Sequence, residues 1–152
     1  MTFPRIASAI FLLVCMIAIV GCASDDSIHS GSVDRQTRIL MSLLSVFYGE
    51  YLDSHRGIPP QDNAVFRAYM QSRSEELQRY NLQSLDQLLT SPRDGKPFEI
   101  VCGKRRAPSD SPDTPWAAYE QQGVDGVVMA VLVRGGVRDL SDAEIQQIVD
   151  GQ

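Results

Sequence analysis

Cys102 is the side chain with the clearest potential for chemistry, because a thiolate becomes a strong nucleophile when a base or a positive field lowers its pKa. The sequence offers two histidines as such a base, His29 and His55. Cys102 ends the apolar run 97–102, where a free cysteine usually behaves as a small buried hydrophobe. We therefore expect packing and no enzymatic activity. A thiol-dependent enzyme using Cys102 and His55 is the less favoured alternative.

The remaining acidic and histidine side chains predict no metal or cofactor. Asp53 and His55 lie two positions apart, but a zinc site needs three or four ligands. The Asp125-Gly126 pair supplies an oxygen ligand that suits calcium, which takes six to eight or so oxygens. Such a pair is ordinarily a turn, and His55 is expected as a solvated residue at a helix end.

Charge limits the classes of partner. The chain has 14 Lys and Arg against 19 Asp and Glu, a net charge of −5, and an acidic protein repels phosphate backbones, so we expect no nucleic-acid binding. The basic run Lys104-Arg105-Arg106 is either a solvated loop or a contact with anionic lipid headgroups. Trp116 and Tyr119 are either packing residues or part of a binding face.

The N-terminal segment is typical of a secretory signal peptide. Arg5 precedes an uncharged run from Ile6 to Ser24, which gives the cationic start, apolar middle and small-residue end of such signals. The run is also long enough for a transmembrane helix, which needs about 17–25 apolar residues. However, Asp25 and Asp26 follow it in place of a basic stop-transfer cluster, and we interpret residues 1–21 as a signal peptide.

The end of this segment, Ile19-Val20-Gly21-Cys22, resembles the lipobox of bacterial lipoproteins. The resemblance implies cleavage between Gly21 and Cys22, a diacylglyceryl group on the Cys22 thiol, and a fatty acyl chain such as palmitate on the new N-terminus. The lipid bilayer would then be a partner through acylated Cys22. Ala23 at the next position permits transfer to the outer membrane, so the implied location is the cell envelope, at the outer membrane or the periplasmic face.

The mature chain is predicted to contain a lipidated flexible tether, residues 22–34, followed by a single domain, residues 35–152. The tether is rich in Ser, Gly and Asp, a composition typical of flexible linkers. The domain begins with a helix whose apolar positions, Leu40, Leu44, Phe47 and Tyr51, form one stripe. Shorter helices follow over 63–71, after a capping box of Ser72 with Glu75, and after another of Ser84 with Gln87.

The second half of the domain is predicted to be a sheet. Strands are expected at 97–102, 115–121, 127–133 and 137–140, with a hairpin turn at Arg134-Gly135-Gly136. The uniformly apolar strand 127–133 should be covered on both faces. Ser141 with Glu144 should cap a last short helix that ends at Val149. Helices first and an antiparallel sheet second indicate an α+β domain.

The segments "HRGIPP", "SPRDGKPFEIVCG" and "GVVMAVLVRGGVRDLS" resemble the pilin and pseudopilin families. The resemblance implies an N-terminal helix and short helices packed on a small antiparallel sheet of about four strands. The chain lacks the prepilin cleavage motif, and Arg134 precedes the turn glycine where these families often have an acidic residue. We therefore expect a non-catalytic binding or assembly domain with an unidentified envelope protein as partner. The alternative is a pseudopilin-like component of a secretion machine.

Overall fold

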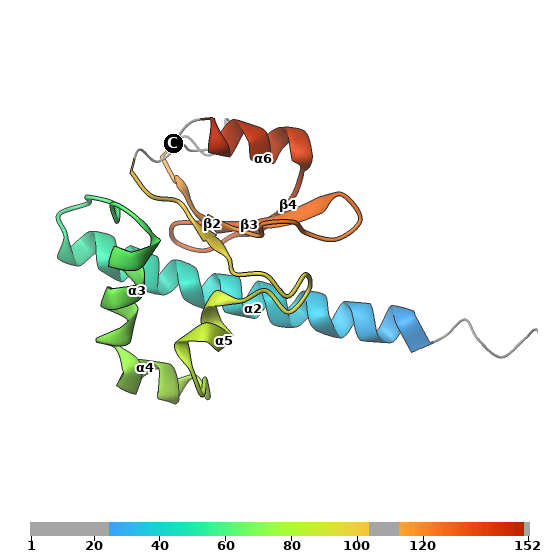
Figure 1. The fold of residues 1–152 in the computed structure, drawn as a ribbon, viewed down its shortest axis with the longest axis horizontal. Helices are drawn as coiled ribbons and strands as arrows, with labels where there is room; N and C mark the ends of the chain where they lie inside the picture. Colours follow the sequence, from blue (N-terminus) through green and yellow to red (C-terminus); the bar gives the residue numbers. More distant parts are fainter. Residues whose placement is uncertain (1–24, 104–112, 151–152) are drawn as a thin grey trace, which may run out of the picture. The chain divides into compact units, whose positions relative to one another are not determined.

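A computed structural model describes residues 25–103 and 113–150. The predicted signal peptide, the lipobox with Gly21 and Cys22, and the basic run 104–106 lie outside these residues. The chain divides into two compact units, Met1–Ser32 and Val33–Gln152. The described elements (Figure 1) are α2 Asp25–Ser54, whose residues from Val33 onward belong to the second unit, α3 Asn63–Gln71, α4 Ser74–Arg79, α5 Leu85–Leu89, β1 Glu99–Ile100, β2 Trp116–Tyr119, β3 Val127–Leu132, β4 Val137–Ser141 and α6 Asp142–Val149.

The four strands form one antiparallel sheet in the order β1-β2-β3-β4. β3 and β4 are joined by the predicted turn at residues 134–136, where Gly135 and Gly136 have φ of 90° and 86°. Glycine adopts such angles without steric cost. The sheet and the helices that precede it confirm the predicted α+β class and the number of strands.

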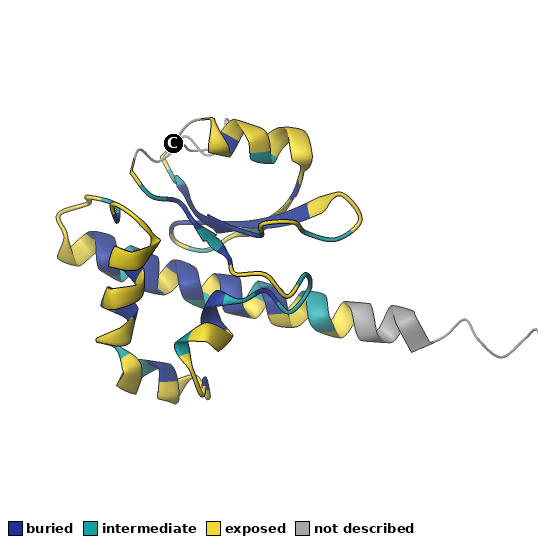
Figure 2. Cartoon of the chain, viewed as in Figure 1, coloured by how far each residue is buried: buried dark blue, intermediate teal, exposed yellow. Residues whose placement is uncertain are grey.

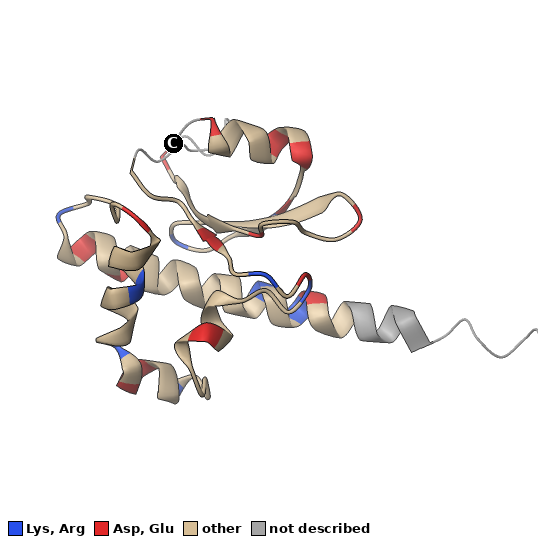
Figure 3. Cartoon of the chain, viewed as in Figure 1, with Lys and Arg blue, Asp and Glu red and all other residues tan. Residues whose placement is uncertain are grey.

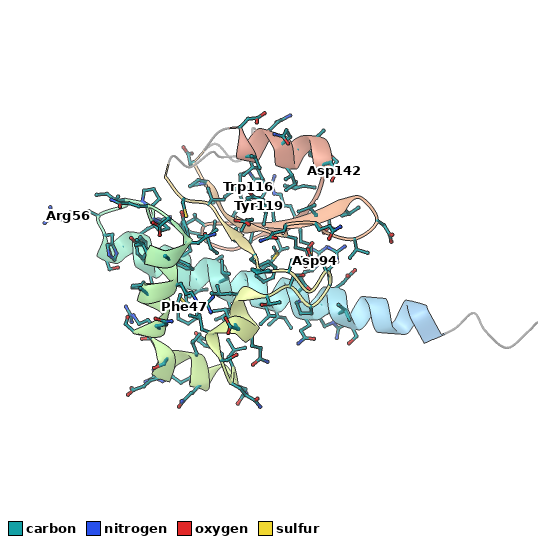
Figure 4. The ribbon with its side chains drawn as sticks, viewed as in Figure 1. Phe47, Arg56, Asp94, Trp116, Tyr119 and Asp142 are labelled. Carbon is teal, nitrogen blue, oxygen red and sulfur yellow. The ribbon has the colours of Figure 1, made fainter. Side chains whose placement is uncertain are left out.

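Helices cover both faces of the sheet, as Figure 1 shows with α2 on one side and α6 on the other. Side chains of a strand alternate between faces, and β3 follows this rule. Met129 and Val131 belong to the core that contains Leu44 and Phe47 of α2. Val128, Ala130 and Leu132 belong to a second core with Trp116, Tyr119, Leu140 and Ile148. The prediction that this strand is buried on both sides is confirmed (Figure 2), and Trp116 and Tyr119 are packing residues (Figure 4).

The predicted stripe of α2 is buried, with Leu40, Leu44, Phe47 and Tyr51 each at most 5% exposed. The predicted tether is wrong from Asp25 onward, because residues 25–34 are the first third of α2. Starting a helix is unfavourable in free energy, whereas extending an existing helix by one residue costs little. The helix that packs in the domain after Val33 can therefore extend toward the N-terminus through polar residues. The compact unit itself begins at Val33, two residues before the predicted boundary at 35.

Two of the three predicted capping motifs are present, those of Ser84 and Ser141, and the motif of Ser72 is not. Ser84 accepts a hydrogen bond from the Gln87 N–H at 3.2 Å, and Glu144 accepts from the Ser141 N–H at 2.8 Å, so both helices begin where expected. The Ser141 hydroxyl also donates to Glu144 Oε2 at 2.7 Å, and the hydrogen bonds from the N–H and the hydroxyl of Ser141 lower the pKa of Glu144. The Ser72 box is wrong: α4 begins at Ser74, and the Ser72 hydroxyl donates instead to the Tyr69 carbonyl at 2.6 Å. A serine hydroxyl at a helix end can donate to a preceding backbone carbonyl as well as accept from a following backbone N–H.

A buried charged network, with no counterpart in the sequence-based predictions, connects α2 to the sheet. Glu120 is fully buried just after β2. Its carboxylate accepts hydrogen bonds from the Ser91 hydroxyl at 2.7 Å, Arg93 Nη1 at 3.0 Å and the Met129 N–H at 2.8 Å. Arg93 Nε lies 3.0 Å from Asp34 Oδ1 on α2. Asp34, predicted as the last residue of the tether, is therefore tied to the domain.

Candidate functional site

Among the described residues, the thiol of Cys102 lacks the environment of a nucleophile. Cys102 follows β1, is half-buried against the main core, and its Sγ donates to Asn63 Oδ1 at 3.7 Å. Burial, together with the nearby carboxylates of Asp62 and Glu99, raises the pKa of the Cys102 thiol to about 11. Reactive cysteines have the opposite shift, toward values below the free thiol.

The imidazole ring of His55 is engaged by neighbouring residues at the C-terminal end of α2. It lies just after α2, where its Nδ1 is 2.8 Å from the Tyr51 carbonyl oxygen and 2.9 Å from Ser54 Oγ, and its ring stacks on Tyr51 with centroids 3.9 Å apart. Among the described residues, no hydrogen bond joins His55 to Cys102. The same part of the chain contains no group of three or more His, Cys, Asp or Glu side chains placed to hold a metal ion. Asp125-Gly126 forms the predicted tight turn, with reciprocal backbone hydrogen bonds between Val124 and Val127 at 3.0 Å.

Alkylation of Cys102 should be slow in the folded protein. With its pKa near 11, about 100-fold less thiolate is present at pH 8 than for the same thiol in the unfolded chain, and the labelling rate should fall accordingly. Because the folded state retains this proton to higher pH, stability should also decline as pH rises toward 11. Iodoacetamide labelling with and without guanidinium measures the rate ratio. Equal rates in both conditions would contradict the raised pKa, and faster labelling of the folded protein would show that Cys102 is an activated thiol.

A groove with unsatisfied polar groups lies elsewhere, between the C-terminal half of α2, the β3–β4 turn and residues 113–115. We call it the α2 groove. Its volume is about 460 Å³, within the range of about 300–1,000 Å³ that is usual for ligand sites. Val46, Leu52, Pro115 and Val133 supply its apolar walls, and the polar lining comes from Ser45, Glu50, Asp53, Asp113 and Arg134. Figure 3 shows acidic positions at the C-terminal end of α2.

Two polar atoms of the residues that line the α2 groove have no hydrogen-bond partner in the described part of the chain. Ser45 is fully buried, and neither its Oγ nor Glu50 Oε2 has a hydrogen-bond partner among the described residues. Other hydroxyls on the same helix are satisfied, since Thr37 and Ser42 donate to carbonyls one turn back at 3.0 and 2.8 Å. Buried polar groups without partners are rare in folded proteins and each one requires an explanation.

Gly49 leaves the floor of the groove open. It lies inside α2 between Ser45 and Asp53, and a methyl group at this position would meet no atom of the described residues within 4 Å. Glycine inside a helix is about 0.5–1 kcal/mol less favourable than alanine. Nothing in the packing of the domain requires glycine here, so the space above Gly49 is available to a ligand.

Arg134 at the rim of the groove has an unusual backbone conformation. Its φ is 134°, a region that is sparsely populated by residues other than glycine and that occurs disproportionately at functional sites. Among the described residues, Arg134 forms no ion pair with Glu50, Asp53 or Asp113. The groove therefore presents three carboxylates and one guanidinium.

A second depression of about 450 Å³ lies beside His55 and is lined by Tyr51, Arg56, Ile58 and Val65 among others. Ile58 is 63% exposed and Val65 37%. The polar groups of Ser54 and His55 are already hydrogen-bonded to each other and to the Tyr51 carbonyl. This depression therefore lacks the unsatisfied groups of the α2 groove, which is the stronger candidate site.

The groove residues Ser45, Glu50, Asp113 and Arg134 were not predicted as site residues. Gly49 is the one local signal, because a glycine inside a helical pattern suggests a packing or functional reason. Comparisons with protein-family models, curated proteins and solved structures find no significant match. The lipobox and the pilin-like resemblance stay predictions. Within residues 25–103 and 113–150, no helix combines the length and hydrophobicity needed to cross a bilayer.

Proposed function

We propose that the chain is an exported lipoprotein, anchored to a membrane of the cell envelope through acylated Cys22, whose α+β domain is a non-catalytic binding or assembly module. The α2 groove is the observation that supports the binding role of the domain. This concave site of ligand size keeps a fully buried hydroxyl and a carboxylate oxygen that have no partner within the described part of the chain. It therefore has the properties of a recognition surface.

The high pKa of the Cys102 thiol and the engagement of His55 by Tyr51 and Ser54 disfavour the thiol-enzyme alternative. A pseudopilin-like filament component is also less favoured. Such a filament needs an apolar helix face free to pack against other subunits, and the apolar stripe of α2 is covered by its own sheet and short helices. The lipobox supports the anchoring half of the proposal.

Replacing Cys22 with alanine should abolish membrane anchoring, because the acyl chains supply the membrane affinity at about 0.8 kcal/mol per buried methylene and two or more chains hold stably. The measurement is cell fractionation followed by immunoblotting. Cys15→Ala is the matched control, since it changes a cysteine of the same apolar segment outside the lipobox and should leave the protein processed and in the membrane fraction. Normal processing and anchoring of Cys22→Ala would contradict lipidation at this residue.

A further inference from the structure

We propose that the α2 groove binds a lysine or arginine side chain carried by an extended segment of a partner protein. This inference rests on the proposed binding role and names the chemistry of the partner. It starts from Glu50, whose Oε2 is buried without a hydrogen-bond donor among the described residues. A carboxylate oxygen in this state is best satisfied by a cationic N–H donor, which forms the stronger, charge-assisted kind of hydrogen bond.

The neighbouring charges favour the same occupant. Asp53 and Asp113 line the groove with Glu50, and Arg134 is the single cation among the described lining residues. This described lining therefore has an excess of two negative charges, which attracts a cation and repels an anion. The Ser45 hydroxyl, fully buried and unpartnered among the described residues, offers a second acceptor for an N–H group.

The apolar surroundings favour a protein segment over a free amine. Val46 and Val133 are walls of the groove, and Ile39 and Val46, seven positions apart on α2, are 59% and 48% exposed. Residues at this spacing share one face of a helix, so an apolar strip leads from the groove along α2. An extended peptide would cover the strip with apolar side chains while its basic side chain enters the groove, and the bare backbone at Gly49 permits close approach.

The test uses the full chain as it is purified from cells in detergent micelles, whatever its N-terminal processing, and the peptide acetyl-Val-Arg-Val-amide as probe. The amide resonance of Gly49 is followed by NMR during titration. We expect saturable binding of this peptide, and binding at least about tenfold weaker for acetyl-Val-Gln-Val-amide, which keeps the apolar groups and lacks the charge.

Two variants locate the binding in the groove. Glu50→Gln should weaken binding of the arginine peptide at least about tenfold. Gly49→Ala, followed through the backbone amide at position 49, should do the same while melting no lower than the wild type, because alanine is the better helix former. The matched controls are Glu75→Gln on the exposed surface of α4 and Gly31→Ala, a second open glycine of α2. Both should bind like the wild type.

Three results would overturn the proposal: equal affinity for the arginine and glutamine peptides, unchanged affinity in Glu50→Gln, or no shift of the Gly49 resonance at about 10 mM arginine peptide. Binding that emerges only after Lys104, Arg105 and Arg106 are all replaced by serine would also overturn it, because the occupant would then be the chain's own basic run. The titration does not depend on how the protein is processed, so its failure is distinguishable from failure of the lipoprotein assignment.

Discussion

Phe47→Asp is expected to leave the domain unfolded. Phe47 is 1% exposed on the buried face of α2, and its ring makes an edge contact with Tyr80 at 6.1 Å between centroids (Figure 4). Truncating a buried phenylalanine costs about 3–5 kcal/mol, and a carboxylate without a partner in the same place adds a further penalty. The sum approaches the whole stability of a domain, about 5–15 kcal/mol.

Circular dichroism and size-exclusion chromatography of residues 33–152 measure this effect. The wild-type fragment should elute as a folded species that does not polymerise. Val46→Asp is the matched control, because it places the same charge one residue away at a position that is 48% exposed and should keep the fold. An undisturbed fold in Phe47→Asp, or filaments of the wild-type fragment, would show that the α2 stripe faces a partner and not the sheet.

Glu120→Ala is expected to cost about 3–5 kcal/mol, the usual effect of removing one partner of a buried ion pair. The substitution leaves the Arg93 guanidinium, the Ser91 hydroxyl and the Met129 N–H without their acceptor. Arg93 and Glu120 side chains are 7% and 0% exposed, so water cannot readily replace the lost partner. Guanidinium denaturation monitored by circular dichroism gives the change in free energy of unfolding.

The exposed pair Arg38–Asp139 provides the control for this prediction. Its side chains are 39% and 49% exposed, and Arg38→Met should change stability by no more than about 1 kcal/mol. The double variant Arg93→Met with Glu120→Met should be less destabilised than the sum of its single variants. Arg93→Met leaves the buried Glu120 carboxylate without its cation, and Glu120→Met leaves the Arg93 guanidinium with only the partly exposed Asp34 as an anionic partner. Strict additivity would mean that the two groups do not act as a pair.

Local patterns in the sequence are sufficient to predict most of the fold. The helical spacing of Leu40, Leu44, Phe47 and Tyr51, and the uninterrupted apolar strand from Val127, are consequences of burial, and burial decides which elements pack together. The turn at residues 134–136 is predictable because glycine is favoured wherever φ is positive.

Most of the failures depend on contacts between residues far apart in the chain. The Ser72 capping box is the exception, because its hydroxyl bonds locally to the Tyr69 carbonyl. Glu120 reads as one acidic residue among 19, and only the tertiary structure brings it to Arg93, 27 positions away. The helical state of residues 25–34 follows from packing that begins at Val33. Apart from Gly49, the sequence carries no local signal of the α2 groove, because the lack of a partner for the Ser45 hydroxyl among the described residues is a property of the tertiary structure.

The central claim, a binding module anchored by lipid at Cys22, is tested most directly by intact mass spectrometry of the protein purified from membranes. The account predicts a chain that begins at Cys22 and carries the mass of a diacylglyceryl group, with an additional acyl chain on the N-terminus. A mature membrane form that still begins at Met1, with no added lipid, would contradict it.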